Sequence, residues 1–190
     1  MAQDEWASSS AIFPLEFCQK LAKKCLLIHA QGLFRPAAIG QGNTKINRTD
    51  LRGDFTSWID EDTPSLLLRS FREQIDTIRL RLNESFYLGL REFETHFAVY
   101  PPGGEYKKHV DNPRGSGARQ ITFILYLNNA WEVGDGGELS FFQPGNEEIL
   151  FTQIQPRIGT FVFFRSDVFP HQVEISKNQR LSLTGWFRNS

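Results

Sequence analysis

The second half of the chain alternates short strand-like runs with glycine- and proline-rich turns, and this alternation limits the possible folds most. Eight runs follow one another from about residue 93: EFETHFAVY, EYKKHV, QITFILYLN, ELSFF, EEILFTQI, GTFVFF, HQVEI and RLSLTGWF. Turns such as YPPGG, EVGDGG and QPGN separate them. Many of the 17 phenylalanines lie in these runs, as expected for strands buried on at least one face. Eight short, regularly spaced strands predict a sandwich, a barrel or a jelly roll.

Two amphipathic helical patterns precede the strands. The first opens at Pro14 and ends at Gly32, and the second starts with Thr63 as N-cap and Pro64 at the first helical position. Apolar residues recur in both at helical spacing, so both helices are expected to pack against one face of a sheet. The fold class is therefore predicted to be α+β and mainly β.

The length of 190 residues fits one domain with a substantial core. We expect residues 1–11 to form a flexible tail and residues 12–190 a single domain. Helices are expected up to about residue 90, and the β core over about 93–188. Residues 40–54 are polar and rich in glycine, which predicts a long loop of the kind that more often has a function.

The charge and composition of the chain limit which kinds of partner it is expected to bind. The net charge of -1 gives no support to a nucleic-acid partner held by phosphate neutralisation. No apolar run approaches the roughly 20 residues of a membrane span, so we expect no membrane association and a cytoplasmic location. The two cysteines, Cys18 and Cys25, fall in the first helix at a separation beyond disulfide reach and are expected to be buried thiols.

His109 and Asp111 can belong to a metal site or to an ordinary strand end before a turn. Residues i and i+2 of an extended chain point to the same side, so both can reach one ion. His171, at the start of a later strand, would complete a 2-His-1-carboxylate face, which leaves positions open for a co-substrate and O₂ in non-haem Fe(II) oxygenases. The other two histidines, His29 and His96, are expected to be a helix-end residue and a core or sheet-surface residue.

Arg180 favours the metal interpretation. Its strand is expected to run beside the metal, and an inward arginine is costly to bury without a partner. A dicarboxylate such as 2-oxoglutarate would supply that partner, because one end can chelate iron while the other accepts the guanidinium fork. Tyr126 could donate to the same carboxylate, and Thr184 and Tyr100 are further candidates. A surface ion pair is the alternative interpretation of Arg180.

Taken together, these patterns resemble the prolyl 4-hydroxylase group of Fe(II)/2-oxoglutarate dioxygenases, most closely the hypoxia-inducible-factor prolyl hydroxylase type. The matching pieces run from about residue 40 to the C-terminus: LRGDFTSWID, VYPPGGEYKKHVDNP, YLN followed by W, GGELSFF, FFRSDVFPHQV and RLSLTGWF. The resemblance implies a double-stranded β-helix, the jelly-roll or cupin-like core, with N-terminal packing helices. The cofactors it implies are Fe(II), the co-substrates 2-oxoglutarate and O₂, and ascorbate as reductant.

The resemblance also implies roles for individual residues. His109, Asp111 and His171 would bind iron as the catalytic centre. Five residues would bind or wall the 2-oxoglutarate pocket: Arg180, Tyr126, Tyr100, Thr184 and Trp186. Four would contact the substrate, two of them on a segment over residues 40–58 that folds over it: Arg52, Asp54, Arg119 and Trp186.

The implied reaction is hydroxylation of a peptidyl proline at C4, with release of succinate and CO₂. A single domain with this pattern resembles the bacterial branch, which suggests elongation factor Tu as the protein substrate. Alternatives are the same cofactor chemistry on another side chain or a free amino acid, a non-catalytic jelly-roll binding module, and a zinc hydrolase built on the same ligands. A nucleic-acid demethylase is disfavoured, because Trp186 stands where that group carries a second arginine.

Overall fold

The computed structural model describes residues 5–37, 50–112 and 117–190. Within these residues the chain forms two helices, α1 (Leu15–Ala30) and α2 (Leu66–Phe86). The described part also forms eleven strands: β1 (Trp6–Ser9), β2 (Arg35–Pro36), β3 (Phe55–Trp58), β4 (Glu92–Tyr100), β5 (Tyr106–His109), β6 (Arg119–Tyr126), β7 (Leu139–Gln143), β8 (Asn146–Ile154), β9 (Phe161–Arg165), β10 (His171–Val173) and β11 (Arg180–Arg188).

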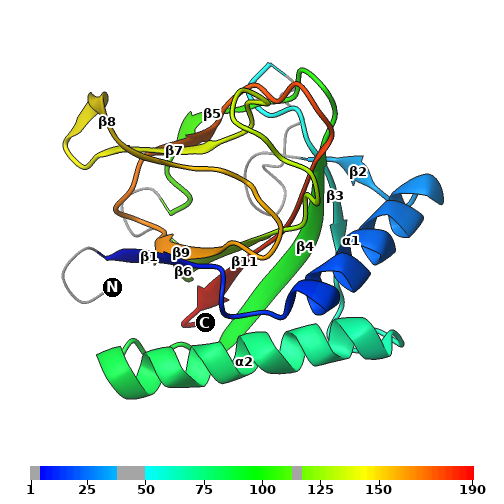
Figure 1. Ribbon diagram of the computed structural model, residues 1–190. Helices are drawn as coiled ribbons and strands as arrows, with labels where there is room; N and C mark the ends of the chain where they lie inside the picture. Colours follow the sequence, from blue (N-terminus) through cyan, green and yellow to red (C-terminus); the bar gives the residue numbers. More distant parts are fainter. Residues whose placement is uncertain (1–4, 38–49, 113–116) are drawn as a thin grey trace.

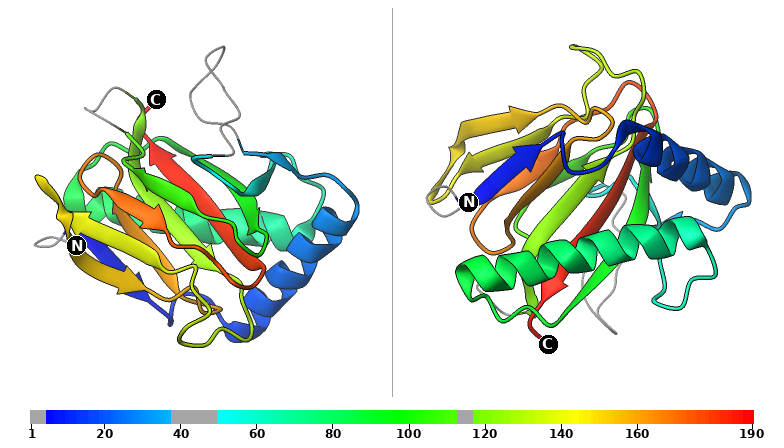
Figure 2. Two further views of the ribbon diagram at one scale, coloured as in Figure 1. Left: turned by 90° about the horizontal axis from the view of Figure 1, so that it is seen from above. Right: turned by 60° about the horizontal axis from the view of Figure 1, so that its bottom comes forward.

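The strands form two antiparallel sheets that face each other, with the helices outside the larger one (Figures 1 and 2). The larger sheet has the order β1-β9-β6-β11-β4-β3-β2, and the smaller has the order β5-β10-β7-β8. The eight strands expected from the sequence are β4 to β11, and they divide equally between the sheets. This is the jelly-roll arrangement, so the predicted fold class is confirmed.

Strand alternation divides the core into two layers. On β4, Phe97 and Val99 face the helices, whereas Ala98 and Tyr100 face the smaller sheet. The helix-side layer includes Phe71 and Ile75 of α2, both fully buried. The layer between the sheets is where polar side chains gather. Because successive strand residues point to opposite faces, each of β4, β6 and β11 contributes alternate residues to this inner layer.

Three local features differ from the sequence predictions. Residues 6–9, expected within a flexible tail, form β1, which pairs with β9 over the register Trp6 to Phe164. The Trp6 ring packs on Phe141 at 5.8 Å between centroids, which supplies the apolar contact that holds the strand. A four-residue strand with a single large apolar residue gives little periodicity to detect.

The segment between the helices is also more regular than expected. Residues 38–49 lie outside the described residues, but Phe55–Trp58, expected within a loop over 40–58, form β3 and pair with β4. The second helix begins at Leu66 with Ser65 as N-cap, two residues beyond the predicted start, and Ser65 makes no side-chain capping bond. Shifts of one or two residues are usual at helix ends.

The remaining sequence expectations concern cysteines and membranes. Cys18 and Cys25 are buried free thiols on α1, as predicted. Burial raises the pKa of Cys18 to about 11 and that of Cys25 to about 12, so both stay protonated at neutral pH. Neither helix in the described ranges is long and apolar enough to cross a membrane.

Candidate active site

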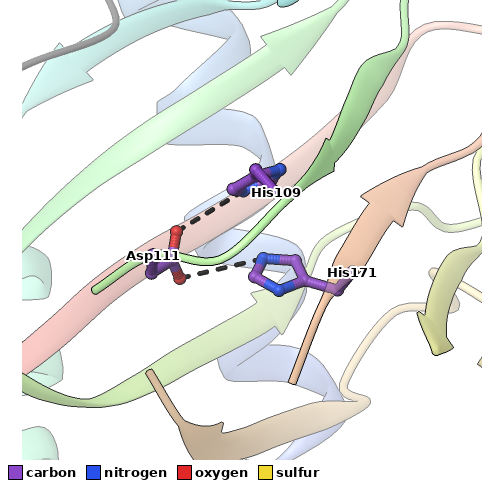
Figure 3. Close-up of side chains that lie close together, drawn as sticks. All are labelled: His109, Asp111 and His171. Atoms are coloured by element: carbon purple, nitrogen blue, oxygen red, sulfur yellow. Dashed lines mark ion pairs between the residues drawn. The ribbon is translucent and has the colours of Figure 1, made fainter. Parts of the chain in front are cut away.

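Strand pairing brings His109, Asp111 and His171 together between the sheets. His109 on β5 is directly opposite His171 on β10, and Asp111 follows two residues after His109. The Nε2 atom of His109 lies 3.5 Å from Oδ1 of Asp111, and Nε2 of His171 lies 3.8 Å from Oδ2. The three side chains point toward one another (Figure 3), with one possible ligand atom from each within 4.8 Å of the others.

The backbone fixes which nitrogen of each imidazole faces inward. His109 donates from Nδ1 to the carbonyl of Lys107 at 2.8 Å, and His171 donates from Nδ1 to the carbonyl of Phe169 at 3.0 Å. A neutral imidazole whose Nδ1 carries the proton presents the lone pair of Nε2. Burial and the neighbouring His109 lower the pKa of His171 to about 4, so that ring is neutral near pH 7. Two imidazole lone pairs and a carboxylate thus converge, an arrangement that attracts a cation.

Asp111 is held by hydrogen bonds to one of its oxygens. Thr122 on β6 donates to Oδ2 at 2.6 Å, and the indole of Trp186 on β11 donates to the same atom at 3.0 Å. Burial by itself raises the pKa of Asp111, but the two imidazoles and the Thr122 hydroxyl hold it below its ordinary value. With Oδ2 accepting both bonds, Oδ1 remains the better placed oxygen for a metal. Outer hydrogen bonds of this kind orient metal ligands and tune affinity.

The metal centre opens into a cavity between the sheets, with about 450 Å³ of space when solvent at its opening is included. One wall comes from β11, whose inward residues are Arg180, Ser182, Thr184 and Trp186. Trp186 lies at the same end of the cavity as Asp111, whereas Arg180 is six residues away along β11. The cavity therefore joins a cluster of metal-ligand atoms to a guanidinium.

Arg180 forms the other polar end. It is 1% exposed, and its Nε donates to the carbonyl of Gly137 at 2.8 Å. Its Nη2 and the hydroxyl of Tyr126 make no hydrogen bond within the described residues. The guanidinium carbon lies 5.0 Å from the ring centroids of both Tyr126 and Tyr100. Burial raises the pKa of Tyr126 to about 12, so its hydroxyl keeps its proton as a donor.

An unpaired buried guanidinium beside a buried phenol is costly unless a ligand satisfies it. A carboxylate fits both groups, because it accepts from the guanidinium and from the hydroxyl. The chemistry of the two cavity ends thus matches a metal ion and one dicarboxylate. This is the pairing that the sequence predicts for Fe(II) and 2-oxoglutarate.

Arg52 and Asp54 also line the cavity, from the turn before β3. They form a two-bond ion pair with Nε to Oδ1 at 2.6 Å and Nη2 to Oδ2 at 3.0 Å. The guanidinium of Arg52 covers the Tyr106 ring at 4.7 Å, and Tyr106 stacks on His109 at 3.6 Å between ring centroids. These contacts connect the segment before β3 with the metal centre.

Arg119 is placed differently from the other candidates, because it is not among the residues that line the cavity. Its guanidinium lies 3.6 Å from the Trp186 ring centroid and forms an ion pair of 2.7 Å with Glu94. Arg119 thus covers the outer side of Trp186.

Among the residues that line the cavity, His96, Tyr106 and Thr122 were not predicted as site residues from the sequence. The alternation of side chains along a strand could have identified two of them. Thr122 is four residues before Tyr126 on one strand, and His96 is four residues before Tyr100 on another. Residues at such intervals on one strand share its face.

The comparisons with known proteins agree with this geometry. Residues 95–188 match the model of the 2OG-Fe(II) oxygenase superfamily. The chain is 33% identical to human prolyl hydroxylase EGLN3 over 168 residues, covering 84% of this chain and 68% of that protein. A crystal structure of a Pseudomonas putida prolyl-4-hydroxylase aligns with a TM-score of 0.88 at 35% identity, covering 98% of this chain and 94% of that one.

Fold and site define an oxygenase of the jelly-roll class. Within that class, the chain belongs to the prolyl hydroxylases of the 2OG-Fe(II) oxygenase superfamily, which confirms the resemblance noted in the sequence. It is also 31% identical to human Egl nine homolog 1 over 177 residues, but it spans only 40% of the length of that relative.

Proposed function

We propose that the protein is a Fe(II)- and 2-oxoglutarate-dependent dioxygenase that hydroxylates a peptidyl proline at C4 in a protein substrate. One observation carries the proposal: a single cavity has a His-Asp-His cluster at one end and the unpaired, buried guanidinium of Arg180 at the other. A site for metal alone would not need Arg180, and a dicarboxylate site alone would not need three converging ligand atoms. Both ends together suit a co-substrate that chelates iron.

In this proposal His109, Asp111 and His171 hold the iron. Arg180 and Tyr126 bind the far carboxylate of 2-oxoglutarate, with Tyr100 beside them. Thr184 and Trp186 form the wall between the ends, and Trp186 also orients Asp111. Bound iron and 2-oxoglutarate supply O₂ activation coupled to oxidative decarboxylation, which yields succinate and CO₂ as one oxygen atom enters the substrate C–H bond.

The chain's own residues supply position and protection. Hydrogen bonds from Thr122 and Trp186 hold Asp111 in one orientation. The aromatic rings of Tyr106, Phe141 and Phe164 surround the two imidazoles, at centroid distances from 3.6 to 6.0 Å. Such packing excludes water, which protects a reactive site and strengthens its electrostatic interactions.

The proposed substrate is a proline within a protein, as the names of the prolyl hydroxylase relatives suggest. Arg52 and Asp54 lie in the cavity wall and Arg119 on the outer side of Trp186, and we assign these residues to substrate binding. Elongation factor Tu, suggested by the resemblance to bacterial members, is the first protein to test. Ascorbate is proposed as the reductant that keeps the iron in its ferrous state.

The decisive experiment incubates the protein with Fe(II), 2-oxoglutarate and purified elongation factor Tu, and in parallel with a bacterial lysate. Mass spectrometry should find one added oxygen on a proline, together with stoichiometric succinate. His109→Ala and Asp111→Ala should abolish both products, and Arg180→Ala should raise the 2-oxoglutarate requirement far more than it weakens metal binding. His29→Ala, a histidine outside the cavity, is the matched control. Added oxygen on another residue type would overturn the prolyl assignment, and turnover by Asp111→Ala would overturn the metal centre.

A further inference from the structure

His96 is a buried imidazole to which the proposed reaction assigns no role. It is 1% exposed and lines the cavity, yet neither of its ring nitrogens makes a hydrogen bond within the described residues. Its ring packs against Trp58 at 4.7 Å and against Trp186 at 5.5 Å between centroids. A histidine that serves only to fill space next to tryptophans leaves two polar atoms unsatisfied, and an apolar residue would avoid that cost.

The strand register places His96 at the metal end of the cavity. On β4, His96 is opposite Thr184, whereas Tyr100 is opposite Arg180. Thr184 is two residues from Trp186, whose indole donates to Asp111. A molecule that extends from Arg180 toward the metal centre therefore passes Tyr100 first and reaches the level of His96 last.

The protonation state of His96 defines what it can bind. Burial, followed by the positive charges of Arg52 and Arg119, lowers the pKa of His96 well below its ordinary value, against an opposing effect of Asp111. The ring is therefore neutral near pH 7 and offers one N–H donor and one acceptor. The donor suits a carboxylate oxygen, and it carries no positive charge to repel a bound cation.

We propose that His96 is a positioning residue that donates a hydrogen bond to the 1-carboxylate of 2-oxoglutarate, the one next to the keto group. The inference rests on the proposed function, because it assumes that 2-oxoglutarate occupies the cavity. Arg180 and Tyr126 hold one end of the co-substrate and His96 holds the other. The three unsatisfied polar side chains of the described cavity region then have one common ligand.

Succinate separates this role from a general effect on cavity shape. It retains the carboxylate for Arg180, but its second carboxylate stands in place of the keto carbon, one carbon short of the 1-carboxylate that His96 would contact. Calorimetric titration under argon, with Mn(II) in place of Fe(II), measures the affinity for both ligands without turnover. The variants are His96→Leu, which removes the donor, and His96→Gln, which retains an N–H donor. His29→Leu serves as the control for loss of a histidine elsewhere.

We expect His96→Leu to weaken 2-oxoglutarate binding about 10- to 100-fold, the range for a hydrogen bond to a charged group. Succinate affinity should change less than about threefold, and His96→Gln should recover most of the loss. Equal weakening of both ligands would overturn the proposal in favour of a packing role, and unchanged 2-oxoglutarate affinity would remove His96 from the co-substrate site. If the wild-type protein binds no 2-oxoglutarate, the proposed function itself fails, and this inference fails with it.

Discussion

Replacing Thr122 by valine tests whether the support of Asp111 controls metal affinity. Valine has nearly the shape of threonine, so the cavity keeps its walls, but the 2.6 Å hydrogen bond to Oδ2 of Asp111 disappears. The indole of Trp186 would then be the remaining described donor to that oxygen. Thr122 is 1% exposed, so bulk water does not readily replace its hydroxyl.

The expected loss of metal affinity follows from the kind of hydrogen bond that Thr122 makes to Asp111. A buried hydrogen bond to a charged group contributes about 1.5–3 kcal/mol, and about 1.4 kcal/mol corresponds to a tenfold change in an equilibrium constant. Loss of this bond should therefore weaken metal binding about 10- to 100-fold, which agrees with the usual effect of removing an outer partner of a metal ligand. The Thr122 hydroxyl also contacts Ser166 at 2.9 Å, so Thr122→Val leaves that buried hydroxyl without this partner.

Ser166→Ala is the matched control, because it removes the contact with Thr122 and keeps the bond from Thr122 to Asp111. Anaerobic competition titrations with a chromophoric chelator measure the Fe(II) affinity of both variants. We expect Ser166→Ala to stay within about threefold of wild type. Metal affinity in Thr122→Val equal to that of wild type, with the fold intact by circular dichroism, would refute the reasoning.

Three further predictions concern stability. Metal-free protein should lose up to about 3 kcal/mol between pH 7 and pH 4, because the pKa of His171 is about 4 when folded and near 6.5 when unfolded, so the unfolded chain binds the proton first. Denaturant titrations should show a smaller pH dependence in His171→Leu, and an unchanged dependence would contradict the assignment. Gly185→Ala should lower the thermal midpoint, at a cost of about 1–3 kcal/mol or more, because its Cβ would collide with the Phe123 ring and the Glu94 carbonyl. Trp6→Ala should cost about 1–3 kcal/mol of unfolding free energy, and no loss would mean that β1 adds nothing to the fold.

The sequence predicted the β core well because its strands are rich in apolar residues and are separated by clear turn residues. All eight expected runs are strands, and β4 has the bounds of the run EFETHFAVY. The pairing of His109 with His171 could not be read from the sequence, because cross-strand register depends on contacts between distant residues. Only the third ligand and Arg180 made the His109–Asp111 pair stand out from a common strand end.

The features that the sequence did not predict depend on long-range contacts. β1, β2 and β3 have at most four residues each and extend the larger sheet, so neighbouring strands rather than their own periodicity stabilise them. The sequence predicts a core or sheet-surface position for His96, and the residue is buried. Its position at the metal end depends on its pairing with Thr184, a long-range contact that local sequence does not encode.

The small side chains in the middle of the cavity wall affect which acids the cavity can hold. Ser182 on β11 lies opposite Ala98 on β4, so two small side chains face the space between the metal cluster and Arg180. Their small size leaves this space open to the carbon chain of an acid that is held at both ends. Ala98→Leu would fill part of the space and favour less bulky acids, while both polar ends kept their chemistry. Selection among cellular organic acids would thus depend on side-chain volume at two wall positions between the polar ends.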